Sequence, residues 1–209
     1  MPITEQFNPL NAGKLALWKI EESVEFLQAS LDLTHEQERA LALRATESGK
    51  KGFLAVRAAL VHLGNPLTSL TVDPLGAPLL PNHHCSFSHT PDFAAVALDQ
   101  SPVGVDIEFY RPKIKRISSK FVHAKEHSHL PQQQTVEWLT RLWTAKEALY
   151  KILKIPGLSL SQDIEVAPFT LEDTVGKAKV QYGKESHFFD LHFRTFENHQ
   201  LTIAKTMHL

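Results

Sequence analysis

The chain has 209 residues, 43% of them hydrophobic and 22% charged, which is the composition of a globular protein with one large or two small domains. The formal net charge of -1 excludes a global field that would attract nucleic acid or an anionic membrane, so bound phosphate must be met by local basic clusters. The single cysteine, Cys85, excludes an intrachain disulfide and fits a reducing compartment. No apolar run approaches the roughly 18 residues that span a bilayer, and residues 1–10 lack a signal-peptide pattern, so we expect a cytoplasmic protein.

The first part of the chain is predicted to be a strand followed by helices. Thr34, with Gln37 three residues later, is typical of a capping box at the start of a helix. Gly64 is placed to end a later helix, and residues 73–76 have the composition of a turn. The predicted elements are a strand at 14–20, helices at 21–31, 34–44 and 48–63, and a strand-like segment at 67–72.

The centre of the chain is predicted to be an antiparallel meander. Three strand-like runs, at 85–88, 93–98 and 103–109, are separated by short connections rich in turn residues. In such a meander His89 and the acidic residues of the third strand would lie at neighbouring strand ends.

The second half of the chain repeats the pattern of a long helix followed by strands. A helix is predicted at 136–153, stopped by Pro156 and Gly157, and strands at 164–166, 177–182, 188–196 and 201–206. We therefore predict an α+β fold of two similar, pseudo-twofold subdomains, 1–100 and 101–209. Each would be a small antiparallel sheet packed against a long helix.

Two acids on the third central strand form a candidate metal site. Asp106 and Glu108 are two positions apart, so their carboxylates project from the same face of a strand. Like charges this close repel unless a cation or protons lie between them, and Mg²⁺ prefers such hard oxygen ligands. The spacing fits equally well an edge strand with two solvated acids.

A second candidate group lies on the predicted long helix. Glu147 and Lys151 are four positions apart and share a helix face, with Trp143 one turn earlier. Taken alone, this pattern favours a surface salt bridge, although a tryptophan on that side is unusual for a fully solvated face.

Taken together, the two motifs resemble a known family. GVDIE at 104–108, WTAKEALYK at 143–151 and the Ser88-His89 pair occur in the order found in 4'-phosphopantetheinyl transferases. Chain length and the two-half organisation are similar to the monomeric, surfactin-synthetase-activating branch. The resemblance covers about residues 33–165.

The resemblance implies roles for individual residues. Asp106, Glu108 and Glu147 would bind Mg²⁺, with Mn²⁺ as the alternative, together with the coenzyme A pyrophosphate. Lys151 would contact the attacked phosphate, and either Glu147 or Glu126 would be the general base. Further coenzyme A contacts are expected from Arg39, Arg44, Lys50, Lys51, Arg57, Ser88, His89 and Lys146. One family feature is missing, because Ala77 stands where a basic residue is common.

The implied activity is transfer of 4'-phosphopantetheine from coenzyme A to a serine of an apo acyl or peptidyl carrier protein, with release of 3',5'-ADP. A monomer is expected, with no nucleic-acid or membrane partner. Carrier proteins are acidic, so residues 109–121 are predicted to face the carrier. Two alternatives stay open: a non-catalytic module that binds coenzyme A or carrier protein, and another Mg-dependent phosphoanhydride hydrolase.

Overall fold

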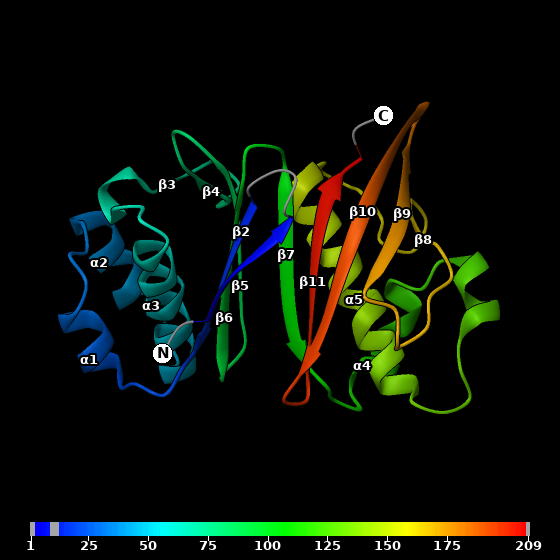
Figure 1. The fold of residues 1–209 in the computed structure, drawn as a ribbon, viewed down its shortest axis with the longest axis horizontal. Helices are drawn as coiled ribbons and strands as arrows, with labels where there is room; N and C mark the ends of the chain where they lie inside the picture. The colour runs from blue at the N-terminus through cyan, green and yellow to red at the C-terminus, as the bar shows by residue number, and fades with distance from the viewer. Residues whose placement is uncertain (1–2, 9–12, 208–209) are drawn as a thin grey trace. The chain divides into compact units, whose positions relative to one another are not determined.

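Antiparallel strand pairing organises both halves of the chain. The structure, a computed structural model, describes residues 3–8 and 13–207, and it divides into two compact units, Met1–Gln100 and Ser101–Leu209 (Figure 1). Each unit holds an antiparallel sheet and a long helix, so the predicted α+β class is confirmed. The pseudo-twofold relation between the halves stays a prediction. No helix in the described ranges has both the length and the apolar character needed to cross a bilayer.

The first unit is built on a four-stranded sheet with the order β1-β2-β6-β5. Every residue of β6 is buried, which explains its nearly continuous apolar sequence. The β1 strand was not predicted. The strands are β1 (Ile3–Asn8), β2 (Gly13–Lys19), β5 (His84–His89) and β6 (Phe93–Asp99).

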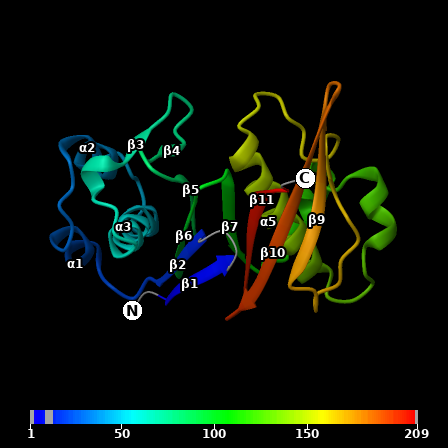
Figure 2. The same cartoon turned by 45° about the horizontal axis from the view of Figure 1, so that its top comes forward.

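Three helices pack together in this unit: α1 (Val24–Ala29), α2 (His35–Ala42) and α3 (Glu47–His62) (Figure 2). The capping box predicted at Thr34 is confirmed, because its hydroxyl accepts from the Gln37 amide and the Gln37 side chain accepts from the Thr34 amide, both at 3.3 Å. Helix α3 contributes a fully buried face to the core against β6.

The strand predicted at 67–72 is only partly correct. A 3₁₀ helix, η1 (Leu67–Ser69), takes the first part, and the short β3 (Thr71–Val72) pairs with β4 (Pro78–Leu79). The side-chain amide of Gln37 donates to the Leu67 carbonyl oxygen at 2.9 Å, a tertiary contact that competes with strand pairing. The turn at 73–76 is confirmed, with the Asp73 carboxylate accepting from the backbone amides of Leu75 and Ala77.

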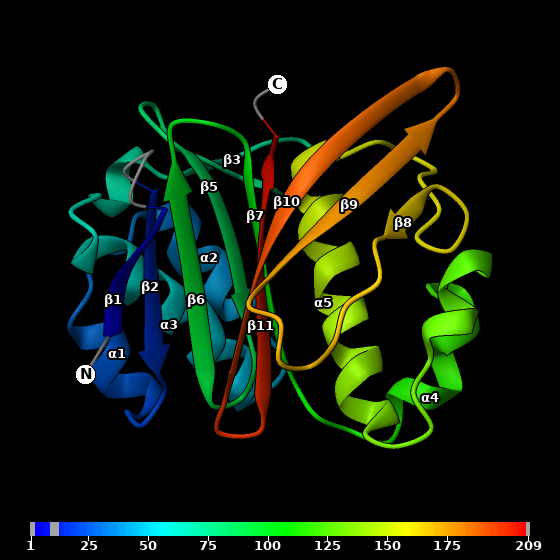
Figure 3. The same cartoon turned by 45° about the vertical axis from the view of Figure 1, so that its right-hand side comes forward.

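The second unit is built on a five-stranded sheet with the order β7-β11-β10-β9-β8. Helix α5 (Thr135–Leu153) runs along one face of it and packs on β7 and β11 (Figure 3). Short helical turns precede α5: α4 (Ile114–Ile117), η2 (Ser118–Lys120) and η3 (Ala124–His129). The strands are β7 (Val103–Phe109), β8 (Ile164–Val166), β9 (Val175–Tyr182), β10 (Glu185–Phe196) and β11 (His199–Thr206).

The predicted meander is wrong at its third strand. β5 and β6 pair as expected, but β7 pairs with β11, in a register that sets Asp106 opposite Thr202. β11 is buried almost throughout and pairs with seven residues of β7. The short connection between β6 and β7 predicts that these two strands pair with each other, because a partner so much later in the chain leaves no sign in the local sequence. His89 and the acidic pair therefore do not lie on neighbouring strands of one sheet.

A buried arginine fixes α5 on its sheet. Arg141 is only 2% exposed and donates to the Gln200 side chain at 3.1 Å, to the backbone oxygens of Thr170 and Asp173 at 2.7 and 2.9 Å, and to the Thr195 hydroxyl at 3.2 Å. Because buried charge is costly unless it is hydrogen-bonded, these four contacts define the rotation of α5 about its axis.

Candidate metal and phosphate site

The approach of α5 to β7 depends on Gly104, the first residue of the GVDIE motif. A Cβ atom added at Gly104 would overlap the Ala148 carbonyl oxygen and lie 3.1 Å from Cγ1 of Ile152. The absence of a side chain therefore allows helix and strand backbones to meet. This contact brings the acids of the strand toward the charged residues of the helix.

The strand and helix groups meet at Asp106 and Lys151. The Lys151 ammonium donates to Oδ1 of Asp106 and to the Val105 carbonyl oxygen, both at 2.8 Å. Asp106 is 6% exposed, so this ion pair is shielded from solvent on the acidic side. Next to it the hydroxyls of Thr144 and Thr202 lie 2.7 Å apart and tie α5 to the strand paired with β7.

Glu147 lies within the field of both strand acids. Burial and then the negative charge of Asp106 raise the pKa of Glu147 to about 7, with a further contribution from Glu108, while Lys151 opposes the shift. Glu147 is therefore close enough to the strand acids for their charges to disfavour its ionised form, which is the situation that a bound cation relieves.

Glu108 has a basic partner that the sequence did not indicate. Burial and the Asp106 charge raise the pKa of Glu108, while Arg111, at 2.9 Å, and a hydrogen bond from Trp143 lower it. The Arg111 guanidinium lies 4.2 Å from the centre of the Phe109 ring. The hydrogen bond explains why Trp143 lies on the charged side of α5.

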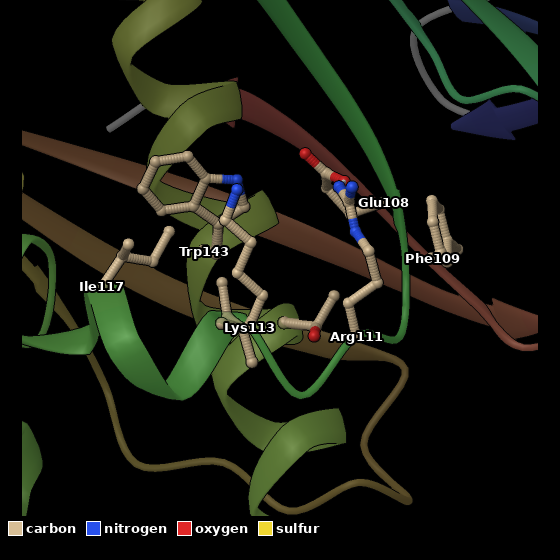
Figure 4. Close-up of a pocket in the computed structure, with 8 residues that line it drawn as sticks. Glu108, Phe109, Arg111, Lys113, Ile117 and Trp143 are labelled. Atoms are coloured by element: carbon tan, nitrogen blue, oxygen red, sulfur yellow. Dashed lines mark hydrogen bonds and ion pairs between the residues drawn. The ribbon is translucent and has the colours of Figure 1, made fainter.

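A cavity of about 170 Å³ opens beside Glu108 (Figure 4). Arg111 reaches from the loop after β7 toward the Glu108 carboxylate, and the Trp143 indole forms another part of the wall. The lining residues are Glu108, Phe109, Arg111, Lys113, Ile114, Ile117, Thr140 and Trp143. The cavity thus combines apolar walls with two basic side chains next to a candidate metal ligand.

The donor set fits magnesium in chemistry. Asp106, Glu108 and Glu147 offer hard oxygen atoms, and Mg²⁺ commonly uses one or two carboxylates together with substrate phosphate. Among the residues that the structure describes, no three His, Cys, Asp or Glu side chains form a ready-made metal cluster. Lys151 pairs with one oxygen of Asp106, and Arg111 pairs with one oxygen of Glu108.

Glu126 and Lys146 form a separate, fully buried ion pair. Lys146 is 0% exposed, and its ammonium donates to Oε2 of Glu126 at 2.8 Å and to the carbonyl oxygens of Leu160 and Ile164 at 3.0 and 2.8 Å. The other Glu126 oxygen accepts from the Val166 amide at 2.8 Å. Both groups are thus engaged in linking α5 to β8, and contact with substrate would require this network to open.

In the first unit, two predicted phosphate ligands stack on one ring. The guanidinium carbon of Arg57 lies 3.2 Å from the Phe53 ring centre and that of Arg44 lies 5.0 Å from it. Burial, and then the charge of Arg44, lower the pKa of Arg57 to about 9. Two cations held this close favour an anion as a third partner.

The other predicted coenzyme A ligands of the first unit are more dispersed. Lys51 pairs with Glu47 at 3.5 Å, Lys50 is half-buried and Arg39 is exposed. Ser88 and His89 end strand β5, and His89 packs on α3.

Comparison with known proteins identifies the family. Residues 102–204 match the family profile of the 4'-phosphopantetheinyl transferase superfamily, and this segment contains β7, α5 and every residue of the carboxylate site. The predicted resemblance to this superfamily is thereby confirmed for residues 102–204.

Individual relatives agree with the family match. A 4'-phosphopantetheinyl transferase of Bacillus subtilis is 37% identical over 90 residues, and Sfp of B. subtilis strain 168 is 33% identical over 89 residues. Each match covers 41% of this chain and 39% of the relative. AcpT of Escherichia coli K12 is 35% identical over 112 residues, which are 49% of this chain and 57% of the relative. The chain thus spans between about two fifths and three fifths of the length of these relatives.

Proposed function

We propose that this protein transfers the 4'-phosphopantetheine group from coenzyme A to a serine hydroxyl of an apo acyl or peptidyl carrier protein, as a cytoplasmic monomer. The observation that carries the proposal is the ion pair between Asp106 on β7 and Lys151 on α5, whose charges also act on Glu147, within a segment that matches the transferase superfamily.

The reaction breaks one bond at phosphorus and forms another. The serine oxygen attacks the phosphorus next to pantetheine, and 3',5'-ADP leaves with the electrons of the broken phosphorus–oxygen bond. Asp106, Glu108 and Glu147 would hold Mg²⁺, which neutralises charge on the pyrophosphate oxygens when bound. Lys151, which donates to Asp106 and to the Val105 carbonyl oxygen, would donate to the attacked phosphate.

We assign the general base to Glu147 in preference to Glu126. Glu147 interacts electrostatically with both Asp106 and Lys151, so it belongs to the group that would surround the attacked phosphate. Both oxygens of Glu126 accept hydrogen bonds within a buried network. Glu147 would take the serine proton, and Glu126 with Lys146 would support the helix that carries it.

The basic residues of the first unit would bind the phosphorylated end of coenzyme A. Arg44 and Arg57 on Phe53 supply paired guanidinium groups, which suit phosphate oxygens. Ser88 and His89 would add hydrogen bonds, and Arg39, Lys50 and Lys51 would add longer-range attraction. This division assigns residues 1–100 to coenzyme A binding and residues 101–209 to the metal site and catalysis.

The acceptor protein would approach through the cavity beside Glu108. Arg111 and Lys113 at its wall complement the acidic surface of carrier proteins, and Ile114 and Ile117 offer apolar contact.

The decisive experiment incubates the purified protein with coenzyme A, Mg²⁺ and an apo carrier protein, followed by mass spectrometry of the carrier and quantification of 3',5'-ADP. We expect the carrier to gain the mass of one phosphopantetheinyl group, with one 3',5'-ADP released for each. Release of 3',5'-ADP without a carrier would identify a hydrolase, and coenzyme A binding without either product would identify a binding module. Asp106→Asn should lose the reaction, while Glu185→Gln at an exposed position of β10 serves as the matched control.

A further inference from the structure

A glycine inside helix α3 lies directly beneath the ring of His89. A Cβ atom added at Gly52 would overlap Nδ1 of His89 and lie 2.6 Å from both Cγ and Cε1 of the same ring. All three nearest atoms belong to one imidazole, so the ring rests on the helix backbone at the one point where no side chain intervenes. Gly52 is itself buried.

Glycine at this position is unfavourable for the helix alone. It is the poorest helix former after proline, and the same helix contains Gly49 one turn earlier, where an added Cβ would meet only the Thr46 hydroxyl, at 3.0 Å. Gly49 is therefore near the helix start, where a side chain requires only a small shift of the Thr46 hydroxyl, whereas Gly52 is in the body of the helix and a side chain there requires a whole ring to move.

The two-arginine stack of the same unit starts at the residue that follows Gly52 in α3. Phe53, the residue after Gly52, carries Arg57 at 3.2 Å and Arg44 at 5.0 Å from its ring centre, and Arg57 also donates to the Phe53 carbonyl oxygen at 3.0 Å. Neighbouring positions of α3 thus contact the imidazole of His89, at Gly52, and the two guanidinium groups, at Phe53.

We infer that Gly52 is a positioning residue for coenzyme A binding, which fixes the His89 imidazole against α3 so that it meets a phosphate group of coenzyme A. The inference rests on the proposed function. A side chain at position 52 would push the ring outward while leaving the fold in place, because an exposed side chain at a strand end can rotate whereas a backbone atom cannot.

The test compares Gly52→Ala with Gly49→Ala, each alone and in a His89→Ala background. Coenzyme A affinity is measured by calorimetry without carrier protein, and the histidine Cε1–H resonances are recorded by NMR, the His89 signal being assigned by its loss in His89→Ala. We expect Gly52→Ala to move the His89 signal and to weaken coenzyme A roughly ten-fold, the loss expected for one hydrogen bond to a charged group. Gly49→Ala should change neither.

The double variant separates positioning from packing. If Gly52 acts through His89, Gly52→Ala should weaken coenzyme A no further once His89 is alanine. Unchanged affinity in Gly52→Ala together with reduced affinity in His89→Ala would overturn the inference and leave the proposed function intact. Unchanged affinity in His89→Ala would instead remove His89 from the proposed site.

Folding is controlled within the same set. Alanine favours helix, and His89→Ala removes the obstructing ring, so the double variant should fold with a Tm at or above that of the parent. If Gly52→Ala alone fails to fold while the double variant folds, the ring cannot move aside, and the inference that Gly52 acts on coenzyme A binding and not on folding is overturned.

Discussion

Each unit of this protein holds a cluster of like charges, which are negative in the second unit and positive in the first. In the second unit burial and the charge of Asp106 raise the pKa of both Glu108 and Glu147, that of Glu147 to about 7. In the first unit burial and Arg44 lower the pKa of Arg57 to about 9. Each pKa shift shows that the charged form is disfavoured in its cluster. A ligand of the opposite charge would therefore stabilise each cluster: a cation for the acids and a phosphate for the guanidinium groups.

The units also differ in what a glycine without a side chain allows to approach it. On β7, Gly104 lets two backbones meet, because an added Cβ would overlap a carbonyl oxygen that belongs to helix α5. On α3, Gly52 accommodates a side chain, the His89 ring. A backbone cannot move aside whereas a side chain can, so substitution at Gly104 should cost stability and substitution at Gly52 should cost ligand binding.

The largest effect is expected from removing an acid of the second unit. Asp106→Ala or Glu147→Ala should lower transfer by at least about 10³-fold, the scale observed for loss of preorganised charge stabilisation. Circular dichroism and Tm should show a folded protein. Turnover within ten-fold of the parent in either variant would remove that residue from the metal site.

The buried ion pair should control stability. Lys146→Met leaves the Glu126 carboxylate buried without its cation, and we expect the free energy of unfolding in urea to fall by about 3 kcal/mol. The double variant Lys146→Met with Glu126→Met should recover part of this loss.

Glu126→Gln tests which residue is the general base. If Glu147 is the base, turnover of Glu126→Gln should stay within about ten-fold of the parent. A loss as large as that of Glu147→Ala, at unchanged Tm, would reassign the base to Glu126.

Removal of the helix lysine should reduce rate more than binding. Lys151→Ala loses the donor to the attacked phosphate, and kcat should fall about 10²-fold while KM for coenzyme A changes little. Lys184→Ala, on an exposed turn, is the matched control. Equal rates for the two variants would separate Lys151 from the chemistry.

The smallest effect is the pH dependence of the metal-free fold. Because the pKa of Glu147 is about 7 in the folded protein, against an ordinary value of 4.5, the folded state binds this proton more tightly than the unfolded chain does. The free energy of unfolding should therefore fall as pH rises from 4.5 through 7. Glu147→Gln removes this loss and should stabilise the metal-free protein at pH 8 by on the order of 1 kcal/mol, a value discounted for partial solvent screening.

Added Mg²⁺ gives a second comparison between the parent and Glu147→Gln. Mg²⁺ should raise the Tm of the parent at pH 8 more than that of Glu147→Gln, because the ion relieves repulsion that the variant lacks. An equal rise in both proteins would place the ion elsewhere.

Much of the fold followed from local patterns. The predicted helix at 136–153 corresponds to α5 at Thr135–Leu153, the strand at 164–166 is β8, and the Thr34 capping box forms as expected, because apolar periodicity and capping depend on residues a few positions apart. The same periodicity placed Asp106 with Glu108 on one face and Glu147 with Lys151 on another.

Only the tertiary structure decided what these pairs meet. The partner of β7 is β11, nearly a hundred positions later, and the contact of Lys151 with Asp106 depends on the close approach that Gly104 allows and on the Arg141 network that orients α5. Motif position suggested Lys146 as a coenzyme A ligand and Glu126 as a base. In the structure the two are buried and form an ion pair that links α5 to β8. Sequence by itself determined which residues share a face. Which faces come together depends on long-range packing and on the cost of burying charge, and no local pattern contains either.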